Sequence, residues 1–197
     1  MIRAILFDFY GVWLPDIFAN YLAEAQQQGF EVSDELQKTV NRYYHGLAGV
    51  EEVAGAFRFK LNRPDIDVQQ FVLNENSIAP AIVDFMRGLH AHFVKLGVLA
   101  NLGRQELDLL NNFNQHNQLF EVVSGPLALN LDKPLLDNEV FAQTLQNIGE
   151  PPQNCVVVTG SQEYQNFAAG LGMTVLPFAG FPKLKQDLDQ MLASEVS

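Results

Sequence analysis

Ala4-Ile5-Leu6-Phe7-Asp8-Phe9-Tyr10-Gly11-Val12, near the start of the 197-residue chain, is an apolar run that stops at one carboxylate and continues to a glycine. Continuous apolar runs are typical of parallel strands that are covered on both faces. Open α/β sheets place functional groups at the carboxyl ends of such strands, and glycine allows the backbone to turn there. We therefore interpret Asp8 as a candidate functional residue. A second acid two residues later would complete a magnesium-dependent phosphotransfer site, and this chain has Tyr10 there.

The composition is that of an ordinary globular protein, with 48% hydrophobic and 18% charged residues. The formal net charge of −11 argues against nucleic acid or an anionic membrane surface as the main partner. Cys155 is the only cysteine, which excludes an internal disulfide and fits a reducing compartment. We see no leader segment and no apolar run near the ~20 residues of a membrane helix. The sequence thus predicts a cytoplasmic protein.

Short apolar runs alternate with helix-length segments along most of the chain. This alternation predicts an α/β protein with a doubly wound, Rossmann-like parallel sheet and right-handed crossovers. The predicted strands are Ala4–Phe9, Val94–Ala100, Glu121–Ser124, Cys155–Thr159 and Thr174–Pro177. The predicted helices of this part are Pro80–His90, Gln105–Asn114, Asn138–Ile148, Glu163–Gly170 and Pro182–Leu192.

One region breaks this alternation, because only helical segments follow the first strand until about residue 77. These are Ile17–Gln28, Asp34–His45 and Val50–Leu61. An insertion at this position would lie over the carboxyl edge of the sheet. We therefore predict a small all-helical cap domain at residues 16–77 and an α/β core formed by residues 1–15 and 78–197.

With this organisation, the chain resembles the haloacid dehalogenase-like hydrolase superfamily over essentially its whole length. Four segments in order carry the resemblance: Phe7-Asp8-Phe9-Tyr10-Gly11-Val12, Gly97-Val98-Leu99-Ala100-Asn101, Lys133-Pro134, and Val156-Val157-Val158-Thr159-Gly160-Ser161 with Ala168, Ala169, Gly172 and Met173 behind it. The resemblance implies that Asp8 is the nucleophile and that Lys133 neutralises charge around it. It also suggests that Asn101 orients the substrate or the attacking water. In the cap, Arg42 is the candidate for binding an anionic group, with Arg58 as a competitor.

The departures from the family pattern bear on the function. Tyr10 stands where the phosphatases have a second aspartate, Ala100 replaces a hydroxyl residue, and Thr159 and Gly160 stand where they carry acids. Magnesium prefers several oxygen ligands, usually including carboxylates, so we predict no cofactor and disfavour magnesium without excluding it. Tyrosine, with a pKa of ~10, is also a poor replacement for an acid–base aspartate. Tyr10 either contacts a ligand or fills the space of the missing metal.

Three functions remain open. The first is a metal-independent, dehalogenase-like hydrolase, because the dehalogenases of the superfamily also have Asp-x-Tyr and no acids in the fourth motif. Against that branch, Ala100 lacks their hydroxyl, Val12 replaces their threonine, and Tyr164 falls near their final aspartate. The second is a catalytically inactive protein that binds a small anion or a protein partner, since a fold does not guarantee activity. The third is a magnesium-dependent phosphatase. The predicted ligand of the catalytic alternatives is a small anionic substrate.

Overall fold

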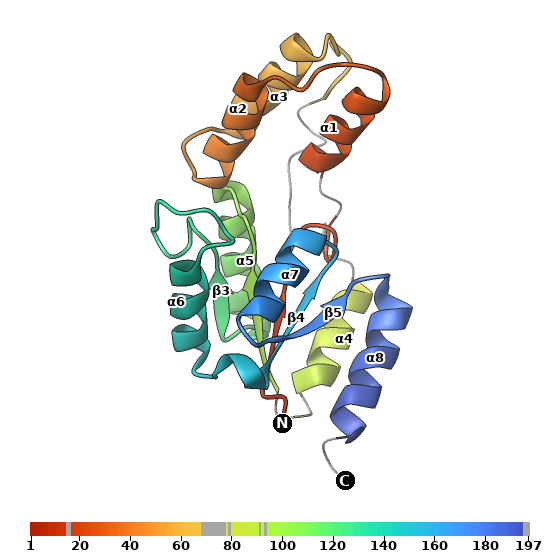
Figure 1. Ribbon diagram of the computed structural model, residues 1–197, viewed down its shortest axis with the longest axis vertical. Helices are drawn as coiled ribbons and strands as arrows, with labels where there is room; N and C mark the ends of the chain where they lie inside the picture. The colour runs from red at the N-terminus through yellow and green to blue at the C-terminus, as the bar shows by residue number, and fades with distance from the viewer. Residues whose placement is uncertain (15–16, 68–77, 79, 91, 93, 195–197) are drawn as a thin grey trace.

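The computed structural model describes residues 1–14, 17–67, 78, 80–90, 92 and 94–194 (Figure 1). Five parallel strands form one sheet in the order β3-β2-β1-β4-β5. From the central strand the chain first moves outward on one side and then on the other, which is the doubly wound arrangement predicted from the sequence. The strands are β1 (Ala4–Phe7), β2 (Lys95–Leu99), β3 (Val122–Ser124), β4 (Cys155–Thr159) and β5 (Thr174–Pro177).

Helices cover both faces of this sheet, which explains why its strands are apolar throughout. One core cluster joins alternate strand residues such as Phe7 and Val98 to three helices, and the other joins residues such as Leu6 and Val157 to two helices. The first face is covered by α4 (Pro80–His90), α5 (Arg104–Asn117) and α8 (Phe181–Ser194). The second is covered by α6 (Asn138–Ile148) and α7 (Gln162–Gly170), and a short 3-10 helix, η3 (Pro152–Asn154), precedes β4.

The three helices that follow β1 form a separate unit above the carboxyl ends of the strands (Figure 1). They are α1 (Ile17–Gln27), α2 (Asp34–Tyr44) and α3 (Val50–Lys60), and they share their own hydrophobic cluster around Phe18, Tyr43 and Phe57. The helical cap predicted from the sequence is therefore present. Its predicted limits fall at residues 16 and 77, which lie outside the described residues, so the boundaries remain a prediction.

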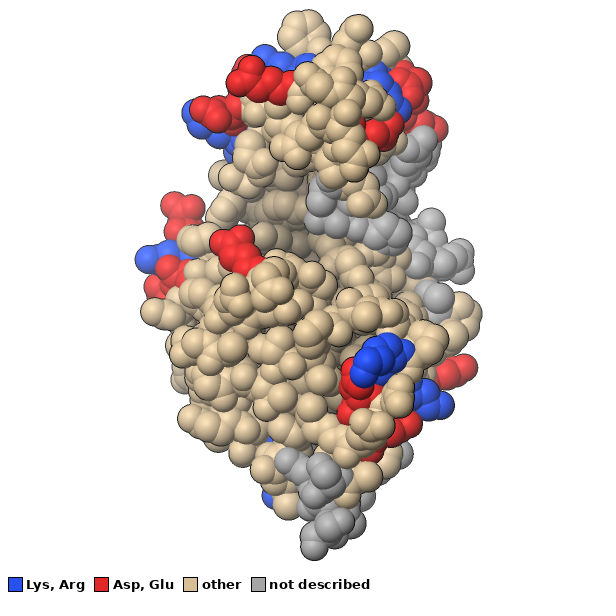
Figure 2. All heavy atoms as spheres, turned by 45° about the vertical axis from the view of Figure 1, so that its right-hand side comes forward, with Lys and Arg blue, Asp and Glu red and all other residues tan. Residues whose placement is uncertain are grey.

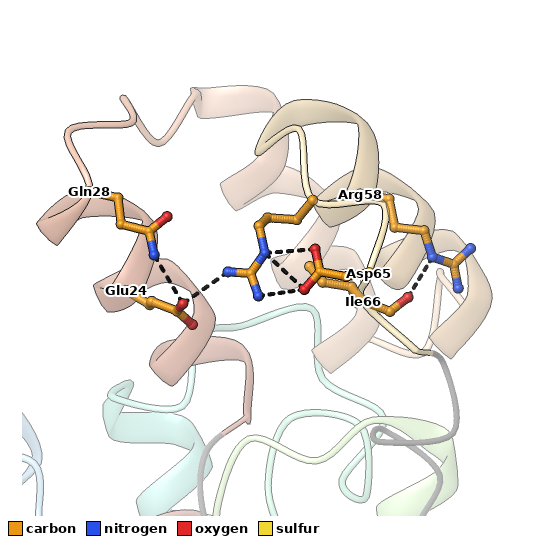
Figure 3. A network of polar contacts seen from close by, with 6 residues as sticks. Glu24, Gln28, Arg58, Asp65 and Ile66 are labelled. Atoms are coloured by element: carbon orange, nitrogen blue, oxygen red, sulfur yellow. Dashed lines mark hydrogen bonds and ion pairs between the residues drawn. The ribbon is translucent and has the colours of Figure 1, made fainter.

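An ionic network on the surface of the cap ties its segments together (Figure 3). The Arg63 guanidinium donates to Glu24 on α1 at 2.9 Å and to Asp65 at 2.8 Å. Nearby, Arg58 Nε donates to the carbonyl of Ile66 at 2.8 Å. These contacts close the chain after α3 back onto α1 and α3.

None of the described helices combines the length and the apolar character that a membrane span requires.

Candidate functional site

Asp8 lies at the carboxyl end of the central strand. Its backbone N–H donates to the carbonyl of Val158 at 2.9 Å, so the residue continues the pairing of β1 with β4. Gly11, three residues later, has a φ of +79°, a left-handed conformation that favours glycine. The sheet therefore fixes the backbone of Asp8, and the chain turns shortly after it.

Thr159, the last residue of β4, holds the carboxylate of Asp8. Its hydroxyl donates to Asp8 Oδ2 at 2.8 Å and accepts the backbone N–H of Ser161 at 3.1 Å. Thr159 is fully buried. Since its hydroxyl receives one hydrogen bond and donates another, its proton is directed at Asp8. A neutral donor thus occupies a position where the phosphatase pattern described above has an acid.

Tyr10 points its phenol away from bulk solvent and towards a buried carboxyl group. The hydroxyl donates to Glu106 Oε1 at 2.5 Å. Burial, and then the negative charge of Glu106, raise the pKa of Tyr10 well above its ordinary value of 10.0. Tyr10 therefore stays protonated and does not replace the missing aspartate as an acid and base.

Tyr164 forms part of the floor beside Asp8. Its buried hydroxyl donates to the carbonyl of Leu99 at 2.8 Å. Burial, followed by the charge of Asp8, raises the pKa of Tyr164 well above the ordinary value. The side chain is therefore a neutral, rigid wall.

A cavity of about 580 Å³ lies beside Asp8 at the carboxyl ends of the strands. Figure 2 shows the surface hollowed between the cap and the core. Three of the predicted site residues, Asp8, Tyr10 and Asn101, line this cavity together. The described lining also contains Gly11, Tyr44, Pro134, Leu135, Leu136, Gly160, Ser161, Glu163 and Tyr164.

Lys133 lies next to the cavity wall but is not among the described residues that line it. Its Nζ is 3.9 Å from Glu139 Oε2, and the side chain is 46% exposed. The following residues, Pro134 to Leu136, do form the wall. The predicted role of Lys133 as charge partner of Asp8 remains a prediction, and it requires the ammonium group to leave Glu139.

The two candidate arginines of the cap are engaged elsewhere. Arg42 Nη1 lies 2.5 Å from Glu52 Oε1, and Nη2 donates to the carbonyl of Leu47 at 3.0 Å. Arg58 is bonded to Ile66 (Figure 3). Neither is a described lining residue of the cavity. The structure does not bring Arg42 together with Asp8, and its predicted role in substrate binding remains a prediction.

The charge of the lining is negative. Asp8 and Glu163 contribute carboxylates, and no described lining residue is Lys or Arg. The residues outside the described ranges contain no Lys or Arg either. Within the described lining, a small anionic substrate would therefore meet polar groups and backbone N–H groups but no basic side chain.

Tyr10 and Thr159 do not offer a magnesium ion the oxygen ligands that carboxylates at their positions would. Magnesium needs near-octahedral oxygen ligands, commonly including one or two carboxylates. Here the Tyr10 hydroxyl is bonded to Glu106, and the Thr159 hydroxyl donates its proton to Asp8. Within the described part of the chain, no three His, Cys, Asp or Glu side chains are arranged to hold a metal ion.

Sequence reasoning missed the residue that connects the site to the cap. Glu106 on α5 accepts Tyr10 and also Tyr43 of α2, whose hydroxyl donates to the same oxygen at 2.5 Å. In the sequence Glu106 is indistinguishable from a solvated acid in the first turn of a helix. Gly103, three residues earlier, is the residue without a Cβ atom that leaves space for Tyr43 and Glu106.

No family model and no curated protein matches the sequence. Solved structures do match. A HAD family enzyme from Bacteroides thetaiotaomicron, in complex with magnesium and inorganic phosphate, has 17% identity and a TM-score of 0.60 over 92% of this chain and 96% of its own. L-2-haloacid dehalogenase from Xanthobacter autotrophicus has 17% identity and a TM-score of 0.59 over 92% and 79%. A β-phosphoglucomutase from Clostridium difficile has 16% identity and a TM-score of 0.55 over 94% and 88%. The chain therefore shares its fold with these HAD family and dehalogenase structures, as the resemblance in its sequence led us to expect.

Proposed function

We propose that this chain is a haloacid dehalogenase-like hydrolase that uses Asp8 as a nucleophile towards a carbon atom and does not need magnesium. The observation that carries the proposal is the Asp8 carboxylate at the cavity wall, with Oδ2 held by the Thr159 hydroxyl at 2.8 Å. A carboxylate that is oriented by the protein is a suitable nucleophile without a metal when the leaving group is stable as an anion.

The proposed reaction has two steps. A lone pair on one carboxylate oxygen of Asp8 forms a bond to the substrate carbon. The bond from that carbon to the leaving group breaks at the same time, and the leaving group keeps its electrons. Water then attacks the carbonyl carbon of the resulting ester. The substrate departs as an alcohol, Asp8 is regenerated and one proton is released to solvent. Because the leaving group is stable as an anion, no metal ion is needed to stabilise the charge that develops on it.

The other predicted residues have proposed supporting roles. Asn101 orients the substrate or the attacking water from the end of β2, where it lines the cavity. Tyr10 contributes an uncharged aromatic wall, since its hydroxyl is bonded to Glu106. Lys133 is the proposed charge partner of Asp8 and would have to swing in from Glu139. Arg42 remains the proposed anion-binding residue of the cap, although Glu52 occupies it in this structure.

We place this activity in the cytoplasm. The only cysteine, Cys155, is a buried free thiol. Burial raises the pKa of this thiol to about 11, so it is poorly reactive. The proposal is compatible with a protein that needs no disulfide for stability.

The test is to measure product release from 2-haloacids, neutral haloalkanols and phosphomonoesters, each with magnesium and with a chelator. We expect halide release that is unchanged by the chelator and falls at least ~100-fold in Asp8→Asn, which keeps the shape of the side chain. Lys133→Met, with Lys133→Arg as its charge-preserving control, tests the charge partner separately. Turnover of phosphomonoesters only with magnesium would replace this proposal by the phosphatase alternative.

A second candidate is a non-catalytic protein that binds a small anion or a protein partner. It is favoured by Ala100, a buried methyl side chain where a hydroxyl is expected, and by the contact of Lys133 with Glu139. This candidate predicts that Asp8→Asn leaves binding of the physiological ligand unchanged. A measurable rate that depends on Asp8 would rule it out.

A further inference from the structure

The most unusual group near the cavity is the carboxyl group of Glu106. The residue is 1% exposed, yet both of its hydrogen bonds are made by one oxygen, Oε1. The other oxygen, Oε2, is buried and has no hydrogen-bond partner in the described part of the chain. Removing a carboxyl group from water is costly unless its oxygens are satisfied. The presence of a buried carboxyl group with one unsatisfied oxygen therefore calls for an explanation.

The two partners of Glu106 come from different parts of the molecule. Tyr10 belongs to the turn after β1 and lines the cavity, whereas Tyr43 lies on α2 in the cap. Glu106 itself is in the first turn of α5, which begins three residues after Asn101. The positive end of the α5 dipole faces this turn and favours a carboxyl group there. One side chain therefore joins the strand ends β1 and β2 to the cap.

The packing around Glu106, Tyr10 and Tyr43 leaves these three side chains little freedom to move. A Cβ atom at Gly103 would lie 2.4 Å from the Tyr43 ring and 2.7 Å from Glu106 Oε2. Tyr10 also packs against Tyr44, the neighbour of Tyr43, with ring centroids 6.2 Å apart. A change in the position of α2 would therefore be felt by Tyr10 through both Glu106 and Tyr44.

We propose that Glu106 is a positioning residue of the Asp8 site, which fixes Tyr10 in the cavity wall and makes its placement depend on the seating of the cap through Tyr43. Its catalytic consequence rests on the proposed function. The coupling between Tyr43 and Tyr10 does not, because it is a property of the structure. This difference allows the two proposals to fail separately.

The experiment labels the phenol carbon of tyrosine with carbon-13 and records NMR spectra of the full chain. The protein has five tyrosines, so five resonances are expected, and Tyr10→Phe and Tyr43→Phe assign the two of interest. The chemical shift of the phenol carbon changes when the hydroxyl loses its hydrogen-bond acceptor. We therefore expect Glu106→Met to shift both resonances. Glu106→Gln keeps an acceptor oxygen and should leave both resonances close to their positions in the parent protein.

The decisive arm is the effect of one tyrosine on the other. Tyr43→Phe should shift the Tyr10 resonance, although the two residues are 33 positions apart in the sequence. Tyr21→Phe is the matched control, since this cap tyrosine packs on Phe57 and should leave the Tyr10 resonance in place. If Glu106→Met fails to fold, Tyr43→Phe and Glu106→Gln still decide the question. An unmoved Tyr10 resonance in Tyr43→Phe overturns the proposal.

Where the Asp8-dependent assay gives turnover, kinetics add a second readout. Glu106→Met and Tyr10→Phe should each lower kcat/KM about tenfold, and the double variant should lose no more than the larger single loss. Glu106→Gln should stay within about twofold of the parent protein. Additive losses in the double variant would show that the two residues act separately and would contradict the proposal. If no turnover is found, the proposed function fails, but the NMR resonances still test the coupling of Tyr43 to Tyr10 through Glu106.

Discussion

The hydroxyl of Thr159 donates a hydrogen bond to Asp8 Oδ2 at a distance of 2.8 Å and accepts one from the backbone N–H of Ser161. This relationship joins the ends of two neighbouring strands, β1 and β4, at the one carboxylate on which the proposed chemistry depends. A hydrogen bond to an ionised group is stronger than one between neutral groups. Thr159 therefore orients Asp8 where a metal ligand would otherwise be expected.

Replacement of Thr159 by valine should impair both stability and turnover. Thr159→Val keeps the shape of the side chain but leaves Asp8 Oδ2 and the Ser161 N–H without this partner. We expect a loss of ~1–3 kcal/mol in the free energy of unfolding, measured by urea denaturation, together with a lower kcat. Thr159→Ser retains the hydroxyl and should be close to the parent protein. Equal behaviour of the valine and serine variants would contradict this role.

Gly103 should tolerate no side chain. The added methyl group of Gly103→Ala would meet the Tyr43 ring at 2.4 Å, so we expect a destabilisation of about 1–3 kcal/mol by thermal or urea unfolding. Gly55 provides the matched control, because it lies inside α3 and no described atom outside the backbone of its own helix lies within 4 Å of the new Cβ. Gly55→Ala should stabilise the protein by about 0.5–1 kcal/mol. A neutral Gly103→Ala would mean that the junction of cap and core is loosely packed.

A variant of Arg42 can test whether this arginine binds the substrate, as the sequence suggested, or stays with Glu52, as in the structure. Its guanidinium contacts Glu52 and the Leu47 carbonyl, and its side chain is 51% exposed. If this arrangement persists during turnover, Arg42→Ala should change stability by less than ~1 kcal/mol and leave KM unchanged. A large increase in KM for an anionic substrate, without a change for a neutral one, would show that the arginine moves into the cavity as the sequence suggested.

The two phenols bonded to Glu106 predict a loss of stability at high pH. Burial and the charge of Glu106 raise the pKa values of Tyr10 and Tyr43 above 10.0 in the folded protein. The unfolded chain then releases these protons first, so stability is intact below about pH 10 and falls above it. Each phenol contributes a slope of up to about 1.4 kcal/mol per pH unit. Urea unfolding between pH 9 and 11 should show a shallower slope in Tyr10→Phe and Tyr43→Phe, and an unchanged slope would contradict the assignment.

The sequence was sufficient to predict the fold because its signals are local. The five apolar runs each became a strand, with bounds that differ by at most two residues at either end, and all eight predicted helices formed. Periodicity and chain order determine such elements directly. The position of Asp8, Tyr10 and Asn101 on one cavity followed in the same way, because carboxyl ends of parallel strands share an edge.

Side-chain partners could not be predicted in the same manner. Lys133 and Arg42 were chosen by resemblance and by residue type, and their nearest carboxylates are Glu139 and Glu52. Glu106 was missed because its burial depends on the docking of α2 against α5, which is a contact between residues 63 positions apart. Such tertiary contacts leave no periodic trace in the sequence.

The measurement that tests the central claim most directly follows the oxygen of water into Asp8. A single turnover with excess enzyme in oxygen-18 water, followed by mass spectrometry of the peptide that contains Asp8, reports whether an ester forms there. We predict one oxygen-18 atom in Asp8 and oxygen-16 in the released alcohol. Oxygen-18 in the product with an unlabelled Asp8 would show direct attack by water and would contradict the role of Asp8 as the nucleophile.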